Sequence, residues 1–200
     1  MAYFPMFMEL EKKICVIIGG GKVALRKANV LVDYGAKVII IAPNFQQQLK
    51  QMEQKGMIIL KEKTISSMKE IDKKELWDGE EEIALCVCAT DQKEVNEKIA
   101  LWCQKERIPV NVVDNKSLCT FLFPAVVKKK EVSIGITTSG TSPSASSYLR
   151  EQIEGIIDDE FLTFVEEMGE YRQWLKQHVE REEERRRMLH SKWEQWKQGE

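Results

Sequence analysis

The first part of the chain alternates between short apolar runs and segments in which apolar residues recur with helical spacing. The run Ile14–Ile18 is continuously apolar and ends in glycines, as expected for a strand that is buried on both faces. In Lys22–Tyr34 the apolar residues have a near-helical period, and Gly35 follows where a helix would end. The same pattern predicts strands at 38–42, 57–60, 83–89 and 109–113, and helices at 45–55 and 94–106. Strands that alternate with helices predict an α/β fold with a mostly parallel sheet.

The pattern changes after residue 113. Two β-like runs flank a turn of three lysines, and a stretch of small residues then opens a helix; these three elements are predicted at 120–127, 131–137 and 144–157. Before this change, residues 66–82 are polar and charged, which predicts a surface helix or loop. We therefore predict a first domain over residues 1–113 and a small α+β domain over residues 114–150.

The remaining residues, 151–200, predict a C-terminal helical domain. Its apolar residues lie three or four positions apart and form one stripe: Phe161, Val165, Met168, Tyr171, Leu175 and Val179. The run Glu180–Arg187 is entirely charged and is predicted to be an exposed helix with i,i+4 ion pairs. Trp193 and Trp196 need a partner surface, which is either a second subunit or the tail's own domain.

Composition argues against several functional classes. The 30 Lys and Arg residues are balanced by 32 Asp and Glu residues, which gives no reason to expect nucleic acid or an anionic membrane as a partner. No apolar run approaches the roughly 20 residues that span a bilayer. The five cysteines are an odd set without a C-x-x-C pair, which favours reduced thiols over a disulfide or metal framework. We therefore expect a cytoplasmic protein.

A glycine-rich motif lies between the first predicted strand and the first predicted helix. The sequence Gly19-Gly20-Gly21-Lys22-Val23-Ala24 fits the pattern G-x-G-x-x-A. In that pattern glycines permit a tight turn and let the backbone approach a pyrophosphate at the helix N-terminus. The alternative is a glycine turn with a purely structural role. Because the motif lies in the first βαβ unit, we interpret it as the dinucleotide-binding loop of a Rossmann-like domain.

The ends of two further strands carry candidate cofactor ligands. The second strand ends at Pro43 and Asn44, where NAD-binding proteins usually have an acidic residue that holds the ribose. Asn44 can still hydrogen-bond a hydroxyl, and no arginine here favours a 2′-phosphate, so we predict NAD rather than NADP. Ala89, Thr90 and Asp91 follow the fourth strand, at the edge where such sheets bind ligands. The alternative role for Asp91 is the N-cap of the next helix.

Asp114 is the candidate catalytic carboxylate. It ends the fifth predicted strand, beside the expected cofactor cleft and at the junction of the first two predicted domains. A carboxylate exposed to substrate at neutral pH is a ready base. The alternative, which the residues alone leave equally open, is a turn aspartate before Asn115.

A second candidate ligand site lies at the start of the helix predicted at 144–157. Ser139, Gly140, Thr141 and Ser142 offer hydroxyl and amide groups that suit an anionic side chain of a substrate. An N-cap loop is the alternative, and the two roles are compatible. We expect no metal site, because both histidines lie on the charged tail.

Several short stretches together resemble the dehydrogenase/ferrochelatase module of siroheme synthase, the precorrin-2 dehydrogenase family. They run in the family's order between residues 3 and about 157: Tyr3–Phe7, Gly19–Ala24 with Arg26 and Lys27, Ala42-Pro43, Ala89–Asp91, Asn111–Asp114, Phe121–Ala125 and Thr138–Pro143. The sequence departs from the family at Ala145–Tyr148, where a more apolar pattern is usual.

The resemblance implies a homodimer with a Rossmann domain, a central dimerisation domain and a C-terminal helical domain. It implies oxidation of precorrin-2 to sirohydrochlorin with NAD⁺, and in some members Fe²⁺ insertion to give siroheme. It also implies that Asp114 is the catalytic aspartate and that Lys22, Val23, Pro43 and Asn44 line the NAD site. Two other functions stay open, an NAD(H)-sensing dimeric module and a scaffold in a tetrapyrrole complex.

Overall fold

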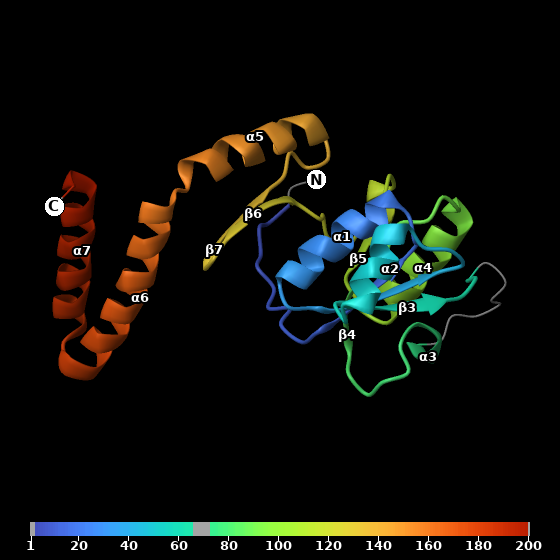
Figure 1. Cartoon of the computed structure of the whole chain (residues 1–200), viewed down its shortest axis with the longest axis horizontal. Coiled ribbons are helices and arrows are strands. Elements are labelled where there is room, and N and C mark those ends of the chain that lie inside the picture. Colours follow the sequence, from blue (N-terminus) through green and yellow to red (C-terminus); the bar gives the residue numbers. More distant parts are fainter. Residues whose placement is uncertain (1–2, 66–72, 200) are drawn as a thin grey trace. The chain divides into compact units, whose positions relative to one another are not determined.

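Five parallel strands form the sheet of the first structural unit, Met1–Phe123 (Figure 1). Their bounds are β1 Ile14–Ile18, β2 Lys37–Ala42, β3 Ile58–Glu62, β4 Ile83–Cys88 and β5 Val110–Val112. The spatial order is β3-β2-β1-β4-β5, so the direction in which strands are added reverses between β1 and β4. This order confirms the predicted parallel sheet of Rossmann type.

Helices connect these strands in the computed structural model, which describes residues 3–65 and 73–199. Their bounds are α1 Lys22–Asp33, α2 Gln47–Gln54, α3 Lys73–Leu76, α4 Lys93–Lys105 and the 3₁₀ helix η1 Lys116–Leu118. Residues 66–72 of the predicted surface segment lie outside the described residues. The predicted helices therefore agree with the observed ones to within one or two residues at most ends.

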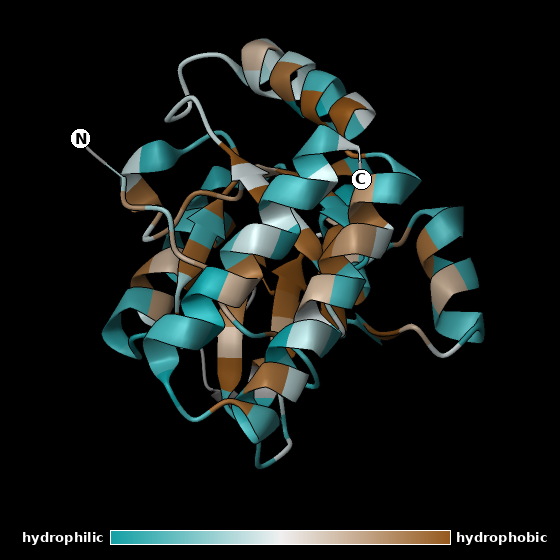
Figure 2. Ribbon diagram, turned by 90° about the vertical axis from the view of Figure 1, so that its left-hand side faces the viewer, coloured by the Kyte–Doolittle hydropathy of each residue, from teal (hydrophilic) through white to brown (hydrophobic). Residues whose placement is uncertain are grey.

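The sheet is buried on both faces, because alternate residues of its strands enter two different apolar clusters. Val16 and Ile18 pack with residues of α4, whereas Cys15 and Ile17 pack with residues of α1 and α2. In Figure 2 the strands are largely brown and the outward surfaces of the helices largely teal. Burial on both sides explains why β1 appears in the sequence as an unbroken apolar run.

Residues 114–123 are held against the sheet of the first unit. Thr120 donates its backbone N–H to the carbonyl of Val110 (2.9 Å), and its hydroxyl accepts from the N–H of Val110 (2.7 Å). The strand predicted from residue 120 therefore begins only at Ala125, after Pro124, which has no N–H to donate. The predicted domain boundaries at 113/114 and 150/151 stay a prediction; the two compact units divide at 123/124.

The second unit, Pro124–Glu200, combines a hairpin with three helices. The antiparallel pair β6 Ala125–Lys129 and β7 Val132–Ile136 is followed by α5 Pro143–Ile156, α6 Asp159–His178 and α7 Glu182–Gln198. Val127, Ile136, Ile157 and Leu162 form its buried cluster. No helix in the described part of the chain is long and apolar enough to cross a membrane.

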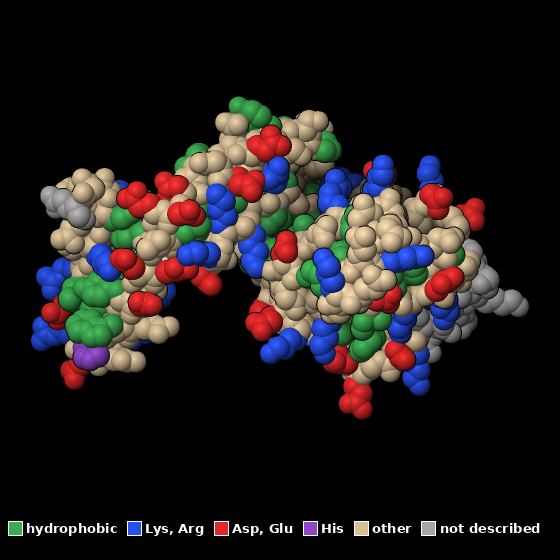
Figure 3. Space-filling view, in the orientation of Figure 1, with side chains coloured by type: hydrophobic (Ala, Val, Ile, Leu, Met, Phe, Trp, Pro, Cys, Tyr) green, Lys and Arg blue, Asp and Glu red, His purple; other side chains and the backbone are tan. Residues whose placement is uncertain are grey.

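The tail consists of two helices that pack on each other. The predicted charged helix from Glu180 begins at Glu182, because the chain turns there and Arg185 donates to the carbonyls of Val179 (2.7 Å) and Glu180 (2.9 Å). Trp196 stacks on Phe164 at a centroid distance of 4.7 Å. Trp193 and Trp196 thus pack on the tail itself, and side chains of both charges lie on the surface of this part of the chain (Figure 3).

Replacing Trp196 with alanine is expected to lower the free energy of unfolding by about 2–4 kcal/mol, because the indole joins α7 to two phenylalanines of α6. Urea denaturation followed by tryptophan fluorescence and circular dichroism measures the loss. Trp174→Ala is the matched control, because Trp174 is 47% exposed and stacks on Tyr171 and His178 of its own helix. Equal losses in the two variants would contradict this account of the tail.

Candidate dinucleotide-binding site

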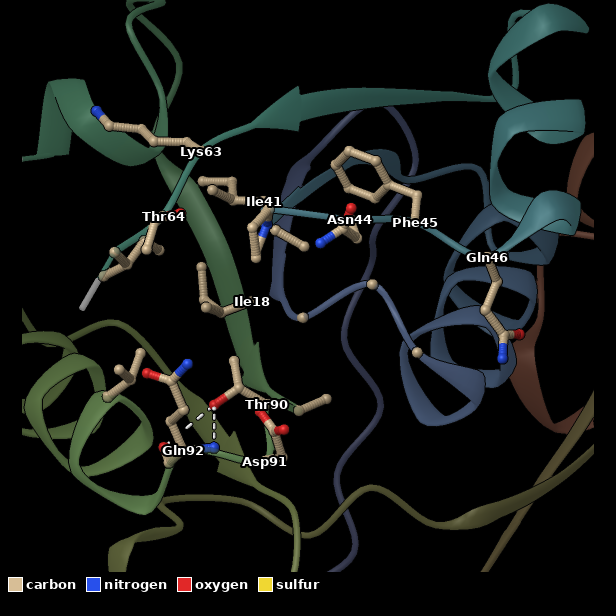
Figure 4. Close-up of a pocket in the computed structure, with 18 residues that line it drawn as sticks. Ile18, Ile41, Asn44, Phe45, Gln46, Lys63, Thr64, Thr90, Asp91 and Gln92 are labelled. Atoms are coloured by element: carbon tan, nitrogen blue, oxygen red, sulfur yellow. Dashed lines mark hydrogen bonds between the residues drawn. The ribbon is translucent and has the colours of Figure 1, made fainter. Parts of the chain in front are cut away.

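A pocket of about 560 Å³ opens at the carboxyl ends of β1, β2 and β4, where the strand order reverses (Figure 4). Parallel α/β sheets bind ligands at this point because the connections on either side diverge and leave a crevice. The wall consists of Ile18, Gly19, Gly20, Gly21, Ile41, Ala42, Pro43, Asn44, Phe45, Gln46, Lys63, Thr64, Ile65, Ala89, Thr90, Asp91, Gln92 and Val95.

The glycine loop passes between the ends of β2 and β4 with no room for side chains at its first two positions. Gly19 has a left-handed φ of +121°, and a Cβ there would overlap the carbonyl oxygen of Ala89. A Cβ on Gly20 would overlap the carbonyl oxygen of Asn44. Backbone hydrogen bonds fix the loop to β2 and to the segment after it, since Gly19 donates to Ile41 (2.9 Å) and Gly20 accepts from Gln46 (3.0 Å).

Gly21 differs from the other two glycines, because a Cβ built on it would meet nothing within 4 Å. It is the N-cap residue of α1, no side chain caps the helix there, and the first turn of α1 carries no acidic residue. The amides of this turn therefore have no side-chain cap, and they lie at the positive end of the helix dipole. A diphosphate fits such a position, so the loop suits a dinucleotide.

Thr90 and Asn96 build the wall of the pocket that follows β4. The buried Asn96 side chain accepts from the hydroxyl of Thr90 (2.7 Å) and donates to its carbonyl (2.9 Å). The Thr90 hydroxyl also accepts from the backbone of Gln92 (3.2 Å), which is the N-cap residue of α4. The capping role considered for Asp91 is therefore wrong, and Asp91 is an exposed residue of the pocket wall.

Eight of the ten predicted cofactor residues line the pocket, and the two others lie on α1. Lys22 is exposed and Val23 half-buried in the first turn of that helix, outside the lining. A contact of Lys22 or Val23 with the cofactor stays a prediction. Cofactor binding by the eight residues that line the pocket stays a prediction as well.

The sequence reasoning missed the wall that comes from the loop after β2 and from the end of β3. Phe45 and Gln46 follow the predicted Asn44, and Lys63 and Thr64 follow β3. The signal that could have found them is the strand order, because β3 lies next to β2 and ends at the same edge.

Asp114 lies at the same edge of the sheet but outside the pocket wall. It follows β5, which pairs with β4, and Val113 donates to the carbonyl of Cys88 (2.9 Å). The Asp114 side chain is exposed, and its φ of +61° is left-handed, which aspartate tolerates better than most residues. Asp114 is thus a turn aspartate by geometry and remains available to solvent and ligands.

The second predicted ligand site belongs to the second unit and forms an N-cap loop. Ser142 is the N-cap of α5, and its hydroxyl accepts from the N–H of Ala145 (3.2 Å). Ser139 and Gly140 both have left-handed φ, and the Thr141 amide donates to the carbonyl of Thr138 (3.0 Å). The capping alternative is therefore confirmed, and an additional role of residues 139–142 toward a substrate stays a prediction.

The sheet order and the glycine loop at its reversal point together define a dinucleotide-binding protein of the Rossmann class. The chain belongs to the family described as "Putative NAD(P)-binding", whose sequence model matches residues 6–125.

Similarity to curated proteins covers all of this chain and so extends beyond that domain. Siroheme synthase from Methylococcus capsulatus is 33% identical over 199 residues, which cover 100% of this chain and 39% of that protein. Siroheme synthase from Nitrosomonas europaea is 29% identical over the same share of each chain. This chain thus spans about two fifths of the curated relatives it matches. Among solved structures, "SirC, precorrin-2 dehydrogenase" shares the fold, with a TM-score of 0.72, 20% identity and coverage of 94% of this chain and 88% of that one.

Proposed function

We propose that the protein oxidises precorrin-2 to sirohydrochlorin with NAD⁺. The observation that carries this proposal is the common edge of the sheet, where the glycine-loop pocket and the exposed Asp114 follow adjacent strands β4 and β5. Similarity to siroheme synthases along the whole chain supports the substrate.

The residues at this edge suit the removal of a hydride and a proton from a reduced macrocycle. When bound, NAD⁺ supplies the hydride acceptor. The amides of Gly20 and Gly21 would hold its diphosphate, and Asn44 would hydrogen-bond a ribose hydroxyl. The Asp114 carboxylate would take up the proton released from carbon or nitrogen of the substrate. The products are sirohydrochlorin, NADH and one proton, so atoms and electrons balance.

We expect this site to bind NAD⁺ at least about tenfold more tightly than NADP⁺, because Lys63, the lysine among the described residues of the pocket wall, does not point toward Asn44 after β2. Asn44 is exposed there, and the Lys63 side chain extends away from Asn44 in Figure 4. Isothermal titration of both cofactors measures the preference, and Asn44→Arg should shift it toward NADP⁺. Equal affinities in the unmodified protein would contradict the assignment.

The remaining expectations extend this proposal. Hydroxyls and amides of Ser139–Ser142 would receive carboxylates of the substrate, and the protein would act as a homodimer. Fe²⁺ would be a second substrate if the protein also makes siroheme. The five free thiols, Cys15, Cys86, Cys88, Cys103 and Cys119, support a reducing compartment such as the cytoplasm.

An end-point assay distinguishes the proposed enzyme from an NAD(H)-sensing module and from a scaffold. Enzymatically made precorrin-2 is incubated anaerobically with the protein, with and without NAD⁺, and the product is identified by its absorption spectrum; Fe²⁺ is added afterwards. The enzyme gives sirohydrochlorin only with NAD⁺. NAD⁺ binding without any product would instead favour the NAD(H)-sensing module or the scaffold.

A further inference from the structure

Lys27 is a half-buried cation on α1 for which the described residues provide no anion. Its Nζ lies 3.6 Å from the ring centroid of Phe123. Within residues 3–65 and 73–199, this ammonium group takes part in no hydrogen bond or salt bridge. A ring face attracts a cation but leaves its N–H donors unsatisfied. An incoming anion would therefore gain more from Lys27 than from an exposed, fully hydrated lysine.

The surroundings of Lys27 disfavour its positive charge, so an anion bound there would stabilise it. Burial lowers the pKa of the Lys27 side chain to about 8, and the positive charge of Arg26 acts in the same direction. Cys119 acts in the opposite direction only as a thiolate, and burial raises the pKa of that thiol above its usual value. The side chain is thus still mostly charged at neutral pH, although none of the groups that shift its pKa is a carboxylate.

Phe123 places Lys27 beside the segment that follows Asp114, and Cys119 ties this segment to the Asp114 turn. The Cys119 sulfur accepts from the N–H of Val112 (3.1 Å) and lies 3.3 Å from the carbonyl oxygens of Val112 and Asn115, to which its S–H can donate. These residues flank Val113 and Asp114 on both sides. Phe123, whose ring the Lys27 ammonium faces, lies two residues after Phe121, and the Phe121 carbonyl accepts from the Asn111 side chain of β5 (3.2 Å). Lys27 therefore lies beside the segment that follows Asp114 in the chain.

We propose that Lys27 binds a carboxylate of the substrate and so selects polycarboxylated tetrapyrroles. The assignment rests on the proposed function for the identity of the substrate. One face of the ammonium rests on the Phe123 ring, and its remaining N–H groups point to the ligand carboxylate. Such a charge-assisted hydrogen bond is among the stronger contacts that a protein can make to an anion.

Binding of a stable polycarboxylated porphyrin tests Lys27 independently of turnover. Uroporphyrin is titrated into a solution of the protein, and its dissociation constant is obtained from quenching of tryptophan fluorescence. The variants are Lys27→Met and Lys27→Gln, which remove the charge, Lys27→Arg, which keeps it, and Lys50→Met, which removes an exposed charge on α2. The dissociation constant for NAD⁺ is measured on every variant to show that the first unit is folded.

We expect Lys27→Met and Lys27→Gln to weaken uroporphyrin binding at least about tenfold. Lys27→Arg should stay within about threefold of the unmodified protein, and Lys50→Met should leave binding unchanged. The dissociation constant for NAD⁺ should be the same in all of them. The KM for precorrin-2 should rise in the neutral variants, with a smaller change in kcat.

Unchanged uroporphyrin affinity in a neutral variant that still binds NAD⁺ would overturn the assignment. Lys27 would then have only a structural role, its contact with the Phe123 ring. Absence of uroporphyrin binding to the unmodified protein would overturn it as well. Lys27-dependent uroporphyrin binding without any precorrin-2 oxidation would leave the anion site in place and refute the proposed function. Oxidation of precorrin-2 with a KM that does not depend on Lys27 would support the proposed function and overturn the assignment of Lys27.

Discussion

Replacing Asp114 with asparagine is expected to lower kcat for precorrin-2 oxidation by about 10²–10⁴-fold, because an amide cannot accept the proton that leaves with the hydride. The fold should tolerate this change, since asparagine is also among the residues that adopt left-handed φ, and Asp114 has a φ of +61°. Steady-state kinetics gives the loss in kcat, and titration with NAD⁺ should give an unchanged dissociation constant.

Glu97→Gln provides the matched control for the loss of a carboxylate. Glu97 is exposed on α4, outside the pocket wall, so this variant should retain full activity. If Asp114→Asn kept more than about a tenth of the activity, the proton would have to go elsewhere, and the assigned role of Asp114 would be wrong.

Replacing Gly20 with alanine is expected to weaken NAD⁺ binding by about ten- to a hundredfold and to destabilise the protein by about 1–3 kcal/mol. The added Cβ would overlap the carbonyl oxygen of Asn44, so the loops after β1 and β2 must move apart. Both loops line the pocket, and their displacement changes the path of the diphosphate. Calorimetric titration with NAD⁺ and urea denaturation measure the two effects.

Gly21→Ala distinguishes an effect on NAD⁺ binding from an effect on the stability of the fold. A Cβ at Gly21 meets no protein atom within 4 Å, so stability should fall by no more than about 1 kcal/mol, the difference between glycine and alanine at an N-cap. NAD⁺ affinity should nevertheless decrease, since the methyl group would occupy the space expected for the diphosphate. Unchanged affinity in Gly21→Ala would show that the cofactor does not approach the start of α1.

Local patterns were sufficient to predict most elements of the first unit. Strands such as β1 are buried on both faces and therefore appear as unbroken apolar runs, and α1 shows its buried face through helical spacing. The loop with Gly19 was also predictable, because strand, glycines and helix follow one another directly in the sequence.

Features that depend on distant contacts could not be predicted in this way. The contribution of Lys63 to the pocket depends on β3 lying beside β2, and the short β6 depends on Thr120 bonding to Val110. The break between α6 and α7 falls at the start of a charged run without glycine or proline, so no local signal marks it.

Parallel recording of NADH and sirohydrochlorin in one anaerobic reaction shows whether this chain couples precorrin-2 oxidation to NAD⁺ reduction. With precorrin-2 and NAD⁺, we expect both products to appear at the same rate and in equal amounts. Neither should appear without NAD⁺, and Asp114→Asn should give only a small residual rate of both. Sirohydrochlorin formation without NADH, or NAD⁺ binding with no product at all, would contradict the assignment of this chain as an NAD-dependent dehydrogenase.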